Sequence, residues 1–360
     1  MKYPNDLYNV TDVYQTNRKE NGTPGGPAWR PERAMEYIHL GRSGLSVSRL
    51  CLGTMNFGPE TEEGSSFPIM DRAHEVGINF FDTANIYGWK KGEGITEKIV
   101  GRWFAQGGGR RERTVLATKV FGAMGDWPNE GRLSALHIRR ACDDSLRRLQ
   151  TDYIDLYQMH HVDRDTPWDE IWEAMEVLRY QGKILYVGSS NFAGWHIAKA
   201  QDAAARRNFV GLVCEQSLYN LFVRAVELEV IPAAQDYGLG VIAWSPLHGG
   251  LLGGILRKEL DGARRVRPGE RATDALAAGA RDKIQAYEDL CQGIGEEAAT
   301  VALAWLLQQP GVTGPIVGPR TMEQLNGALR ALDLQLDEAT LASLDELFPG
   351  HKSAPEDYAW

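Results

Sequence analysis

Four polar side chains lie at the ends of short apolar, β-like segments of the chain. Asp82 and Tyr87 fall in INFFDTANIY. Lys119 ends the run TVLATK, and His160 belongs to IDLYQMHH. Because parallel strands of a barrel bring their carboxyl ends to one face, we expect these side chains to lie close together. The set then holds one carboxylate, one ammonium and two groups that can donate a hydrogen bond.

This set suits chemistry at a carbonyl group. A tyrosine hydroxyl has a reference pKa of about 10, so Tyr87 is protonated but only weakly acidic near neutral pH. An ammonium about 4 Å away favours the phenolate by on the order of 4 kcal/mol at an effective dielectric constant near 20. We therefore expect the charge of Lys119 to lower the pKa of Tyr87. Desolvation would act in the opposite direction and is not included in this value. Asp82 would keep Lys119 charged, and His160 would hydrogen-bond to the carbonyl. The set lacks a reductant, so a cofactor is implied, most simply a nicotinamide.

The elements that must position these residues follow a repeating β-then-α pattern from Met35 onward. Eight β-like runs are expected, at Arg49–Leu52, Asn79–Phe81, Thr114–Ala117, Ile154–Gln158, Leu185–Val187, Leu212–Glu215, Gly240–Ala243 and Gly314–Val317. Amphipathic helices are expected at Phe67–Val76, Thr96–Gln106, Ala135–Leu149, Trp168–Gln181, Trp195–Arg207, Val226–Tyr237, Glu297–Gln308 and Met322–Ala331. The pattern predicts an α/β fold, a single (β/α)8 TIM barrel with a polar N-terminal extension.

Other nucleotide-binding folds fit less well. The first strand is followed by LGTMNFG, which lacks the GxGxxG of a doubly wound dinucleotide domain, and HGGLLGG lacks the GK[ST] of a P-loop. A long basic connection then runs from His248 to a helical pattern that resumes near Ala275. This connection is either a loop that folds over an anionic cofactor or a solvated insertion, and the sequence leaves both open.

Composition narrows the partners and the compartment. The formal net charge is −9 and the isoelectric point is near 5.5, which argues against nucleic acid or an anionic membrane as the partner. No stretch is long and apolar enough to predict a membrane span. The four cysteines show no CxxC pairing and indicate reduced thiols in a cytoplasmic protein: Cys51, Cys142, Cys214 and Cys291.

The two ends of the chain differ from the middle. Residues 1–34 are polar, rich in Pro, Gly and Asn, and without a signal-peptide pattern, so we expect an arm or a disordered extension. Residues 35–350 form the predicted barrel, and residues 351–360 form a tail that contains Tyr358 and Trp360. The tail could shape the substrate pocket, pack against another subunit or pack on its own barrel. A homo-oligomer is left open.

Seven motifs occur in an order that resembles the aldo-keto reductase superfamily over nearly all of Met35–Leu347. They are DTANIYG, LATK, DLYQMHH, VGSSNF, CEQSLYN, IAWSPL and IVGPRTMEQL. The resemblance implies a barrel that reduces aldehydes or ketones with NADPH, forming NADP+, without a metal. It also implies that the family's catalytic tetrad falls on Asp82, Tyr87, Lys119 and His160.

The resemblance further implies a cofactor site. Ser190, Asn191 and Gln216 match side chains that hold the nicotinamide carboxamide, and Trp244 matches an aromatic that stacks on the ring. Further cofactor positions are Gly53, Thr54 and Met55 beside the nicotinamide, Ser245, Leu247 and Gly250 at the pyrophosphate, Gly318, Arg320 at the 2′-phosphate, and Gln324 at the adenine. Many relatives continue QLxEN, whereas this chain reads QLNGA, so the adenine contacts differ at Gly327 and Ala328.

Competing interpretations remain at this stage. His160, His161 and Asp163 could ligate a metal, but adjacent strand residues point to opposite faces, so we expect no metal site. His161 and Trp127 either line the substrate mouth or pack at its rim. The preferred function is an NADP-dependent reductase of aldehydes, ketones or oxidised sugars, including deoxysugar carbonyls. The alternatives are a nicotinamide-sensing regulatory subunit and a metal-dependent barrel hydrolase.

Overall fold

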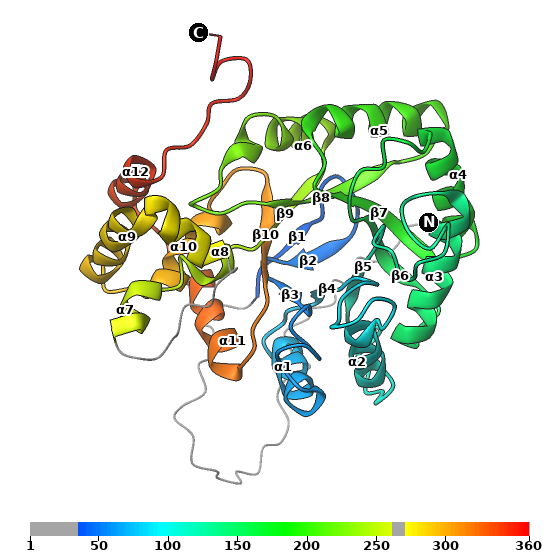
Figure 1. The fold of residues 1–360 in the computed structure, drawn as a ribbon, viewed down its shortest axis with the longest axis horizontal. Coiled ribbons are helices and arrows are strands. Elements are labelled where there is room, and N and C mark those ends of the chain that lie inside the picture. Colours follow the sequence, from blue (N-terminus) through cyan, green and yellow to red (C-terminus); the bar gives the residue numbers. More distant parts are fainter. Residues whose placement is uncertain (1–34, 261–270, 360) are drawn as a thin grey trace, which may run out of the picture. The chain divides into compact units, whose positions relative to one another are not determined.

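A closed barrel of eight parallel strands forms the centre of the molecule (Figure 1). The computed structural model describes residues 35–260 and 271–359. The barrel strands are β3 (Cys51–Gly53), β4 (Phe80–Asp82), β5 (Val115–Val120), β6 (Ile154–Met159), β7 (Ile184–Ser190), β8 (Leu212–Leu218), β9 (Gly240–Trp244) and β10 (Val312–Val317). β10 pairs with both β3 and β9, which closes the ring. The predicted (β/α)8 barrel and its eight strands are confirmed, whereas the predicted extension at residues 1–34 lies outside the described residues.

The barrel strands are buried on both faces, as parallel strands covered by helices should be. On β5, Val115, Ala117 and Lys119 alternate onto the barrel interior. On β6, Leu156 belongs to the interior cluster, while Tyr157 lies in the cluster between the strands and the helices. The inner layer therefore fills the barrel, and its carboxyl-end positions are occupied by polar side chains.

All eight predicted helices are present around the barrel, with ends within a few residues of those expected. They are α1 (Glu63–Glu75), α2 (Ile95–Phe104), α3 (Ala135–Leu149), α4 (Trp168–Tyr180), α5 (Gly194–Arg206), α6 (Val230–Tyr237), α10 (Ala298–Leu307) and α11 (Met322–Leu329). Ser134 caps α3 and Thr321 caps α11 through side-chain oxygens, as these residue types do at helix N-termini. Within the described ranges, no helix has both the length and the apolar composition needed to cross a membrane.

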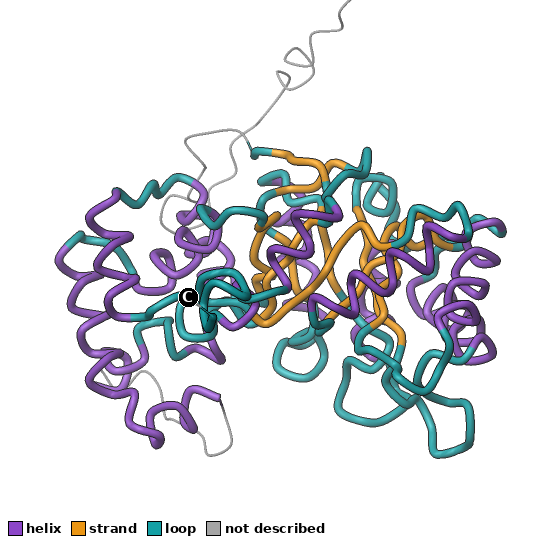
Figure 2. The backbone as a smooth tube through the Cα atoms, turned by 90° about the horizontal axis from the view of Figure 1, so that it is seen from above, coloured by secondary structure: helices purple, strands orange, loops and turns teal. Residues whose placement is uncertain are grey.

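A short hairpin closes the N-terminal end of the barrel, and the sequence pattern did not predict it. β1 (Tyr37–His39) pairs antiparallel with β2 (Ser46–Ser48). A Cβ at Gly41 in its turn would lie 2.5 Å from Gly238 O, so only glycine fits against the chain entering β9. Leu40 and Val47 are fully buried in the barrel interior. Figure 2 shows this hairpin on one side of the barrel and the long loops on the other.

The long connection after β9 contains helices rather than an uninterrupted loop. α7 (Ile255–Leu260) precedes residues 261–270, which lie outside the described residues, and α8 (Arg271–Ala275) and α9 (Arg281–Gly293) follow. The chain ends with α12 (Glu338–Leu347), capped by Asp337, which was also not predicted.

The tail after α12 starts on the connection between β8 and α6. His351 N donates to Glu227 Oε2 at 2.8 Å, and Ala354 N donates to Leu228 O at 2.8 Å. Beyond these contacts Tyr358 is exposed, and Figure 1 shows the tail running outward from the barrel. Of the alternatives left open, the first part of the tail packs on its own barrel, while Trp360 lies outside the described residues.

Candidate active site

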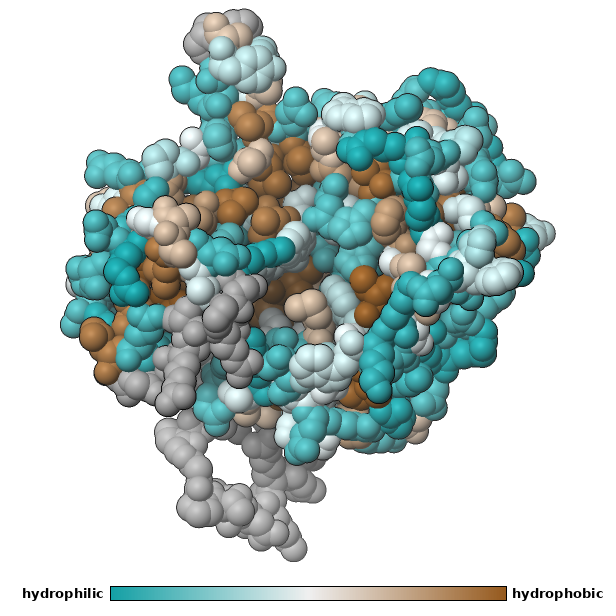
Figure 3. Space-filling view, in the orientation of Figure 1, coloured by the Kyte–Doolittle hydropathy of each residue, from teal (hydrophilic) through white to brown (hydrophobic). Residues whose placement is uncertain are grey.

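The four residues expected to converge lie at the carboxyl end of three neighbouring strands. Asp82 ends β4 and Lys119 lies near the end of β5. His160 directly follows β6, and Tyr87 lies in the loop between β4 and α2. This is the face toward the viewer in Figure 3, which is hollowed near its centre, where hydrophobic residues gather.

The Lys119 ammonium is the centre of the group, and all three of its donors are used. Nζ donates to Asp82 Oδ2 at 2.5 Å, to Thr83 O at 2.9 Å and to Tyr87 Oη at 2.9 Å. Because the phenol oxygen accepts from the ammonium, its own hydrogen is left to be donated to another group. The arrangement therefore presents Tyr87 as a donor.

The carboxylate of Asp82 is held from its other side by two amides. Gln216 Nε2 lies 2.8 Å from Asp82 Oδ1, and Gln158 Nε2 lies 3.1 Å from the same oxygen. The side chains of Asp82 and Lys119 are almost completely buried. A buried ion pair is stable only when its remaining hydrogen-bonding capacity is filled, and these amides fill that of Asp82.

Burial changes the proton affinities from those expected from the sequence. Burial raises the pKa of Tyr87 and outweighs the opposing effect of the Lys119 ammonium. The expectation of a lowered Tyr87 pKa was therefore wrong, because it set desolvation aside. Burial alone would lower the pKa of Lys119, but Asp82 and Tyr87 reverse this and raise it. Both groups are consequently protonated near neutral pH.

His160 completes the group as a neutral imidazole. Burial, aided by Lys119, lowers its pKa to about 2. Its ring centroid lies 6.0 Å from that of Tyr87 in an edge-on arrangement. Its Nδ1 is buried and has no hydrogen-bond partner among the described residues. A neutral imidazole carries one N–H, which can be donated to a carbonyl oxygen.

Strand alternation predicted that the two adjacent histidines would point to opposite faces, and this prediction was wrong. The rings of His160 and His161 stack with centroids 5.0 Å apart and planes 7° from parallel. β6 ends at Met159, so both residues lie beyond the strand and its alternation does not apply. Within residues 35–260 and 271–359, no group of three or more His, Cys, Asp and Glu side chains forms a candidate metal site.

Several residues expected at the cofactor site adjoin this group. Asn191 has a left-handed backbone conformation, and its Nδ2 donates to His160 O at 3.2 Å and to Ser190 Oγ at 3.0 Å. Trp244 Nε1 donates to Asn191 Oδ1 at 3.0 Å. Ser190, Asn191 and Trp244 are thus linked to each other and to the backbone of His160, while Gln216 contacts Asp82.

The turn after β3 is also tied to the group. Thr54 donates to Asp82 O from both its backbone N and its Oγ1, each at 2.9 Å. Gly53 is aligned with Asp82 in the pairing of β3 with β4. Met55 follows with 57% of its surface exposed. The backbone of Asp82 is therefore fixed from the neighbouring strand.

The remaining expected cofactor residues form two further groups, and no hydrogen bond between described residues joins either group to the tetrad. Ser245, Leu247 and Gly250 lie in the turn after β9, where Ser245 and Gly250 have positive φ angles. The second group, Gly318, Arg320 and Gln324, lies just before and in the first turn of α11. Gln324 Oε1 accepts from Arg320 N at 2.8 Å, and Gly318 O accepts from Asn56 Nδ2 at 2.7 Å.

The chemistry of these residues fits a phosphorylated nicotinamide dinucleotide. No described residue donates to Gln216 Oε1, which leaves it available to the N–H of a carboxamide. The Arg320 side chain is about half exposed, and among the described residues it pairs only with Glu60, at 3.8 Å, so its guanidinium is accessible to a phosphate. A Cβ at Gly327 would meet nothing within 4 Å, so the departure from the family pattern leaves open space there.

Comparison with known proteins shows the family of this chain. A model of the aldo/keto reductase family matches residues 49–348. The chain belongs to this family. The predicted resemblance is thereby confirmed, and the chain is an oxidoreductase of the aldo-keto reductase type.

Relatives in the aldo/keto reductase family carry several names. An uncharacterized oxidoreductase, YrpG, from Bacillus subtilis is 55% identical over 332 residues, covering 91% of this chain and all of the relative. A versiconal hemiacetal acetate reductase from Aspergillus parasiticus is 33% identical, covering 87% of this chain and 96% of the relative. A probable voltage-gated potassium channel subunit beta from Arabidopsis thaliana is 31% identical, covering 90% of this chain and all of the relative.

Three residues near the tetrad of this aldo-keto reductase were missed by sequence reasoning. Gln158 interrupts an apolar strand, and this polar residue was the available signal. Glu215, on β8, is fully buried beside Gln216. Arg271, at the start of α8, lies 4.4 Å from the ring centroid of Trp244. No local pattern marks Arg271, because its position depends on how the connection after β9 folds back.

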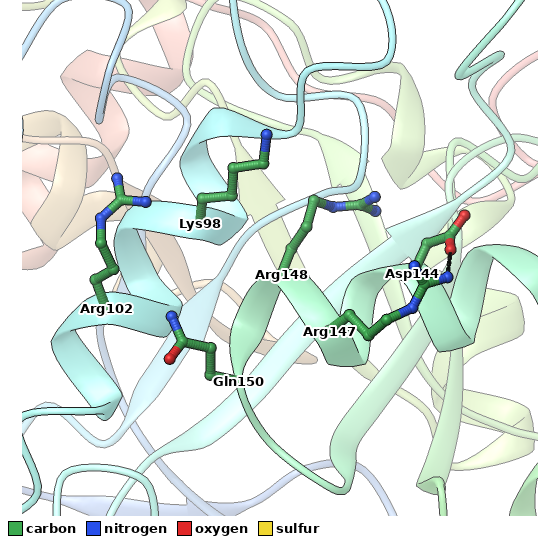
Figure 4. A pocket seen from close by; sticks show the side chains of 6 residues that line it. All are labelled: Lys98, Arg102, Asp144, Arg147, Arg148 and Gln150. Atoms are coloured by element: carbon green, nitrogen blue, oxygen red, sulfur yellow. Dashed lines mark hydrogen bonds and ion pairs between the residues drawn. The ribbon is translucent and has the colours of Figure 1, made fainter.

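A separate cavity of about 290 Å³ lies outside the barrel, between α2 and α3. Figure 4 shows that it is lined by Lys98, Arg102, Asp144, Arg147, Arg148 and Gln150. Its arginines already pair with carboxylates: Arg102 with Glu63, Arg147 with Asp144, and Arg148 with Glu97. The charges that line this cavity therefore form a salt-bridged surface.

Proposed function

We propose that this protein reduces an aldehyde or ketone to an alcohol with NADPH, and that Tyr87 is the general acid. The observation that carries the proposal is the three-way hydrogen bonding of Lys119. It makes the Tyr87 oxygen an acceptor from an ammonium and leaves the phenol hydrogen for the substrate. Since burial raises the pKa of Tyr87, the phenol carries its proton before the reaction begins.

In the proposed mechanism each residue has one task. When bound, the nicotinamide supplies the hydride to the carbonyl carbon. Tyr87 donates its proton to the carbonyl oxygen, and the phenolate that results is stabilised by Lys119 in a site of low dielectric. Asp82 maintains the charge of Lys119. Neutral His160 donates a hydrogen bond to the same carbonyl oxygen and fixes its orientation.

We propose that Ser190, Asn191 and Gln216 hold the carboxamide and that Trp244 stacks on the nicotinamide. The links of Asn191 to His160 and Trp244 support this assignment, because they place the carboxamide-binding residues beside the proton donor. Arg320 would then meet the 2′-phosphate, and this favours NADPH over NADH.

The rim of the barrel indicates a substrate with an apolar or ring-shaped part. Trp89 and Trp127 follow β4 and β5 with 67% and 79% of their surfaces exposed. Lys91 pairs with Asp126, so these two loops are joined. Exposed indole rings can stack on an aromatic ring or on the apolar face of a sugar, and both classes of carbonyl remain candidates.

A nicotinamide-sensing regulatory subunit is the second candidate. It is supported by the name of the potassium channel subunit beta relatives. The hydrogen-bonded group of Asp82, Lys119 and Tyr87, with His160 beside it, favours catalysis, since sensing would not need a protonated Tyr87 poised as a donor. We propose a cytoplasmic location, which the four buried free cysteines support.

The test is a panel of aromatic, aliphatic and sugar carbonyls with NADPH and with NADH. We expect oxidation of NADPH with at least one carbonyl, and a loss of about 10²–10⁴-fold in Tyr87→Phe. Binding of NADPH without turnover of any carbonyl would favour the regulatory subunit. Full activity in Tyr87→Phe would refute the proposed acid.

A further inference from the structure

Glu215 is a fully buried carboxylate that the proposed mechanism does not use. It lies on β8 directly before Gln216. Gln216 faces the barrel interior, where it contacts Asp82, and Glu215 faces the opposite way. Among the described ion pairs, none includes Glu215, so its charge is balanced by hydrogen bonds rather than by a cation.

Those hydrogen bonds come from both sides of the segment that carries Ser190 and Asn191. Glu215 Oε1 accepts from Phe192 N at 3.1 Å, and Glu215 Oε2 accepts a short bond from Ser189 Oγ. The donors therefore lie directly before and directly after the two proposed carboxamide-binding residues. Glu215 holds both ends of this short segment against β8.

Two further contacts complete the attachment. Asn191 N donates to Gln216 O at 3.0 Å, and Ser217 Oγ donates to Glu215 Oε1 at 2.8 Å. Asn191 has φ +60°, a left-handed conformation that costs free energy in a residue other than glycine. Contacts on both sides of Asn191 are what maintain such a conformation.

The ionised form of Glu215, which is the main form above about pH 7, suits this task better than an amide would. It accepts hydrogen bonds at both oxygens and donates none, and here both oxygens face donors. Its burial without a cation is costly, since desolvation raises the pKa to about 7 against the effect of the hydrogen bonds. If the side chain at this position only filled space, an uncharged residue would do so without the free-energy cost of burying a carboxylate.

We propose that Glu215 is a positioning residue of the cofactor site. Its carboxylate holds Ser189–Phe192 in the conformation that presents Ser190 and Asn191 to the nicotinamide carboxamide. This inference rests on the proposed function, because it assumes that those two residues bind a nicotinamide. Glu215 itself touches neither cofactor nor substrate.

The test compares two ligands in the full-length protein. The dissociation constants of NADPH and of adenosine 2′,5′-bisphosphate, which lacks the nicotinamide, are measured for the wild type and Glu215→Gln. We expect Glu215→Gln to weaken NADPH binding about tenfold and to leave the bisphosphate within about twofold. The KM for NADPH should rise by a similar factor while kcat changes less.

A matched control separates positioning from loss of stability. Gln201 is also buried, and it holds the opposite end of β8 through two hydrogen bonds with the backbone of Leu212. Gln201→Met should lower the unfolding temperature and leave the NADPH dissociation constant unchanged. If Glu215→Gln fails to fold, Ser189→Ala removes only one donor to Glu215 and should weaken NADPH binding a few-fold.

The outcomes are distinct. Unchanged NADPH affinity in Glu215→Gln, or in Ser189→Ala where it is the variant used, overturns the positioning role while leaving the proposed function intact. Equal weakening of NADPH and the bisphosphate also overturns it, since the effect would then be general. A wild type that binds no NADPH refutes the proposed function itself.

Discussion

Lys119 Nζ donates to Tyr87 Oη at 2.9 Å while its other two donors are held by Asp82 and by Thr83 O. The ammonium therefore cannot turn away from the phenol without leaving a buried carboxylate unpaired. The stability of the fold and the proposed proton donation therefore depend on the same three hydrogen bonds. Substitutions can separate the effect of Lys119 on stability from its effect on proton donation.

Lys119→Met should abolish carbonyl reduction and also destabilise the fold. It leaves Asp82 as an uncompensated buried charge, which costs about 3–5 kcal/mol. The double variant Asp82→Asn with Lys119→Met should recover part of the unfolding free energy in urea without recovering activity. Recovery of activity together with stability would mean that Lys119 acts only on the fold.

His160 should remain neutral throughout the working pH range, because burial lowers its pKa to about 2. Its ring nitrogens, followed by NMR, should show no protonation between about pH 5 and 8. His160→Ala should lower kcat about 10²–10³-fold, and His160→Gln, which keeps an N–H donor, should lose less. A titration of His160 near pH 6.5 would contradict this view of the site.

Glu215 should make the fold less stable as the pH rises. Below about pH 4.5 its carboxyl is protonated in both the folded and unfolded chains, so its contribution to stability is fully present. Between about pH 4.5 and 7 only the unfolded chain releases the proton, which lowers the free energy of unfolding by up to about 3 kcal/mol. Subtracting the profile of Glu215→Gln isolates this slope, and parallel profiles would argue against the raised pKa.

Arg320 should determine the preference between the two nicotinamide dinucleotides. Arg320→Ala should raise the dissociation constant of NADPH about 10–100-fold and leave that of NADH nearly unchanged. Arg139→Ala removes an equivalent exposed charge from α3 and serves as the control. An equal effect of Arg320→Ala on both dinucleotides would place its contact elsewhere on the cofactor.

The fold and the tetrad were predictable from the sequence for a physical reason. Parallel strands end on one face, so a polar residue that closes an apolar run, such as Asp82 or Lys119, has its position fixed by topology. The hairpin around Gly41 lacks such a run, and its turn fits closely against Gly238 at the barrel end. α12 is marked in the sequence by its capping residue, Asp337.

The properties that depend on burial could not be predicted in the same way. The direction of the Tyr87 pKa shift is set by how much solvent is removed, and a sequence does not give that quantity. The hydrogen bond from Phe192 N to Glu215 joins β8 to the segment that follows β7, and a single acidic residue in CEQSLYN gives no sign of it.

The most direct test of the account is the Tyr87→Phe protein, studied with a carbonyl substrate found in the panel. Its dissociation constant for NADPH is measured first, and its rate of hydride transfer is then measured in a single turnover. We expect unchanged NADPH binding and a transfer rate lower by about 10²–10⁴-fold. A transfer rate equal to that of the wild type would show that Tyr87 is not the proton donor.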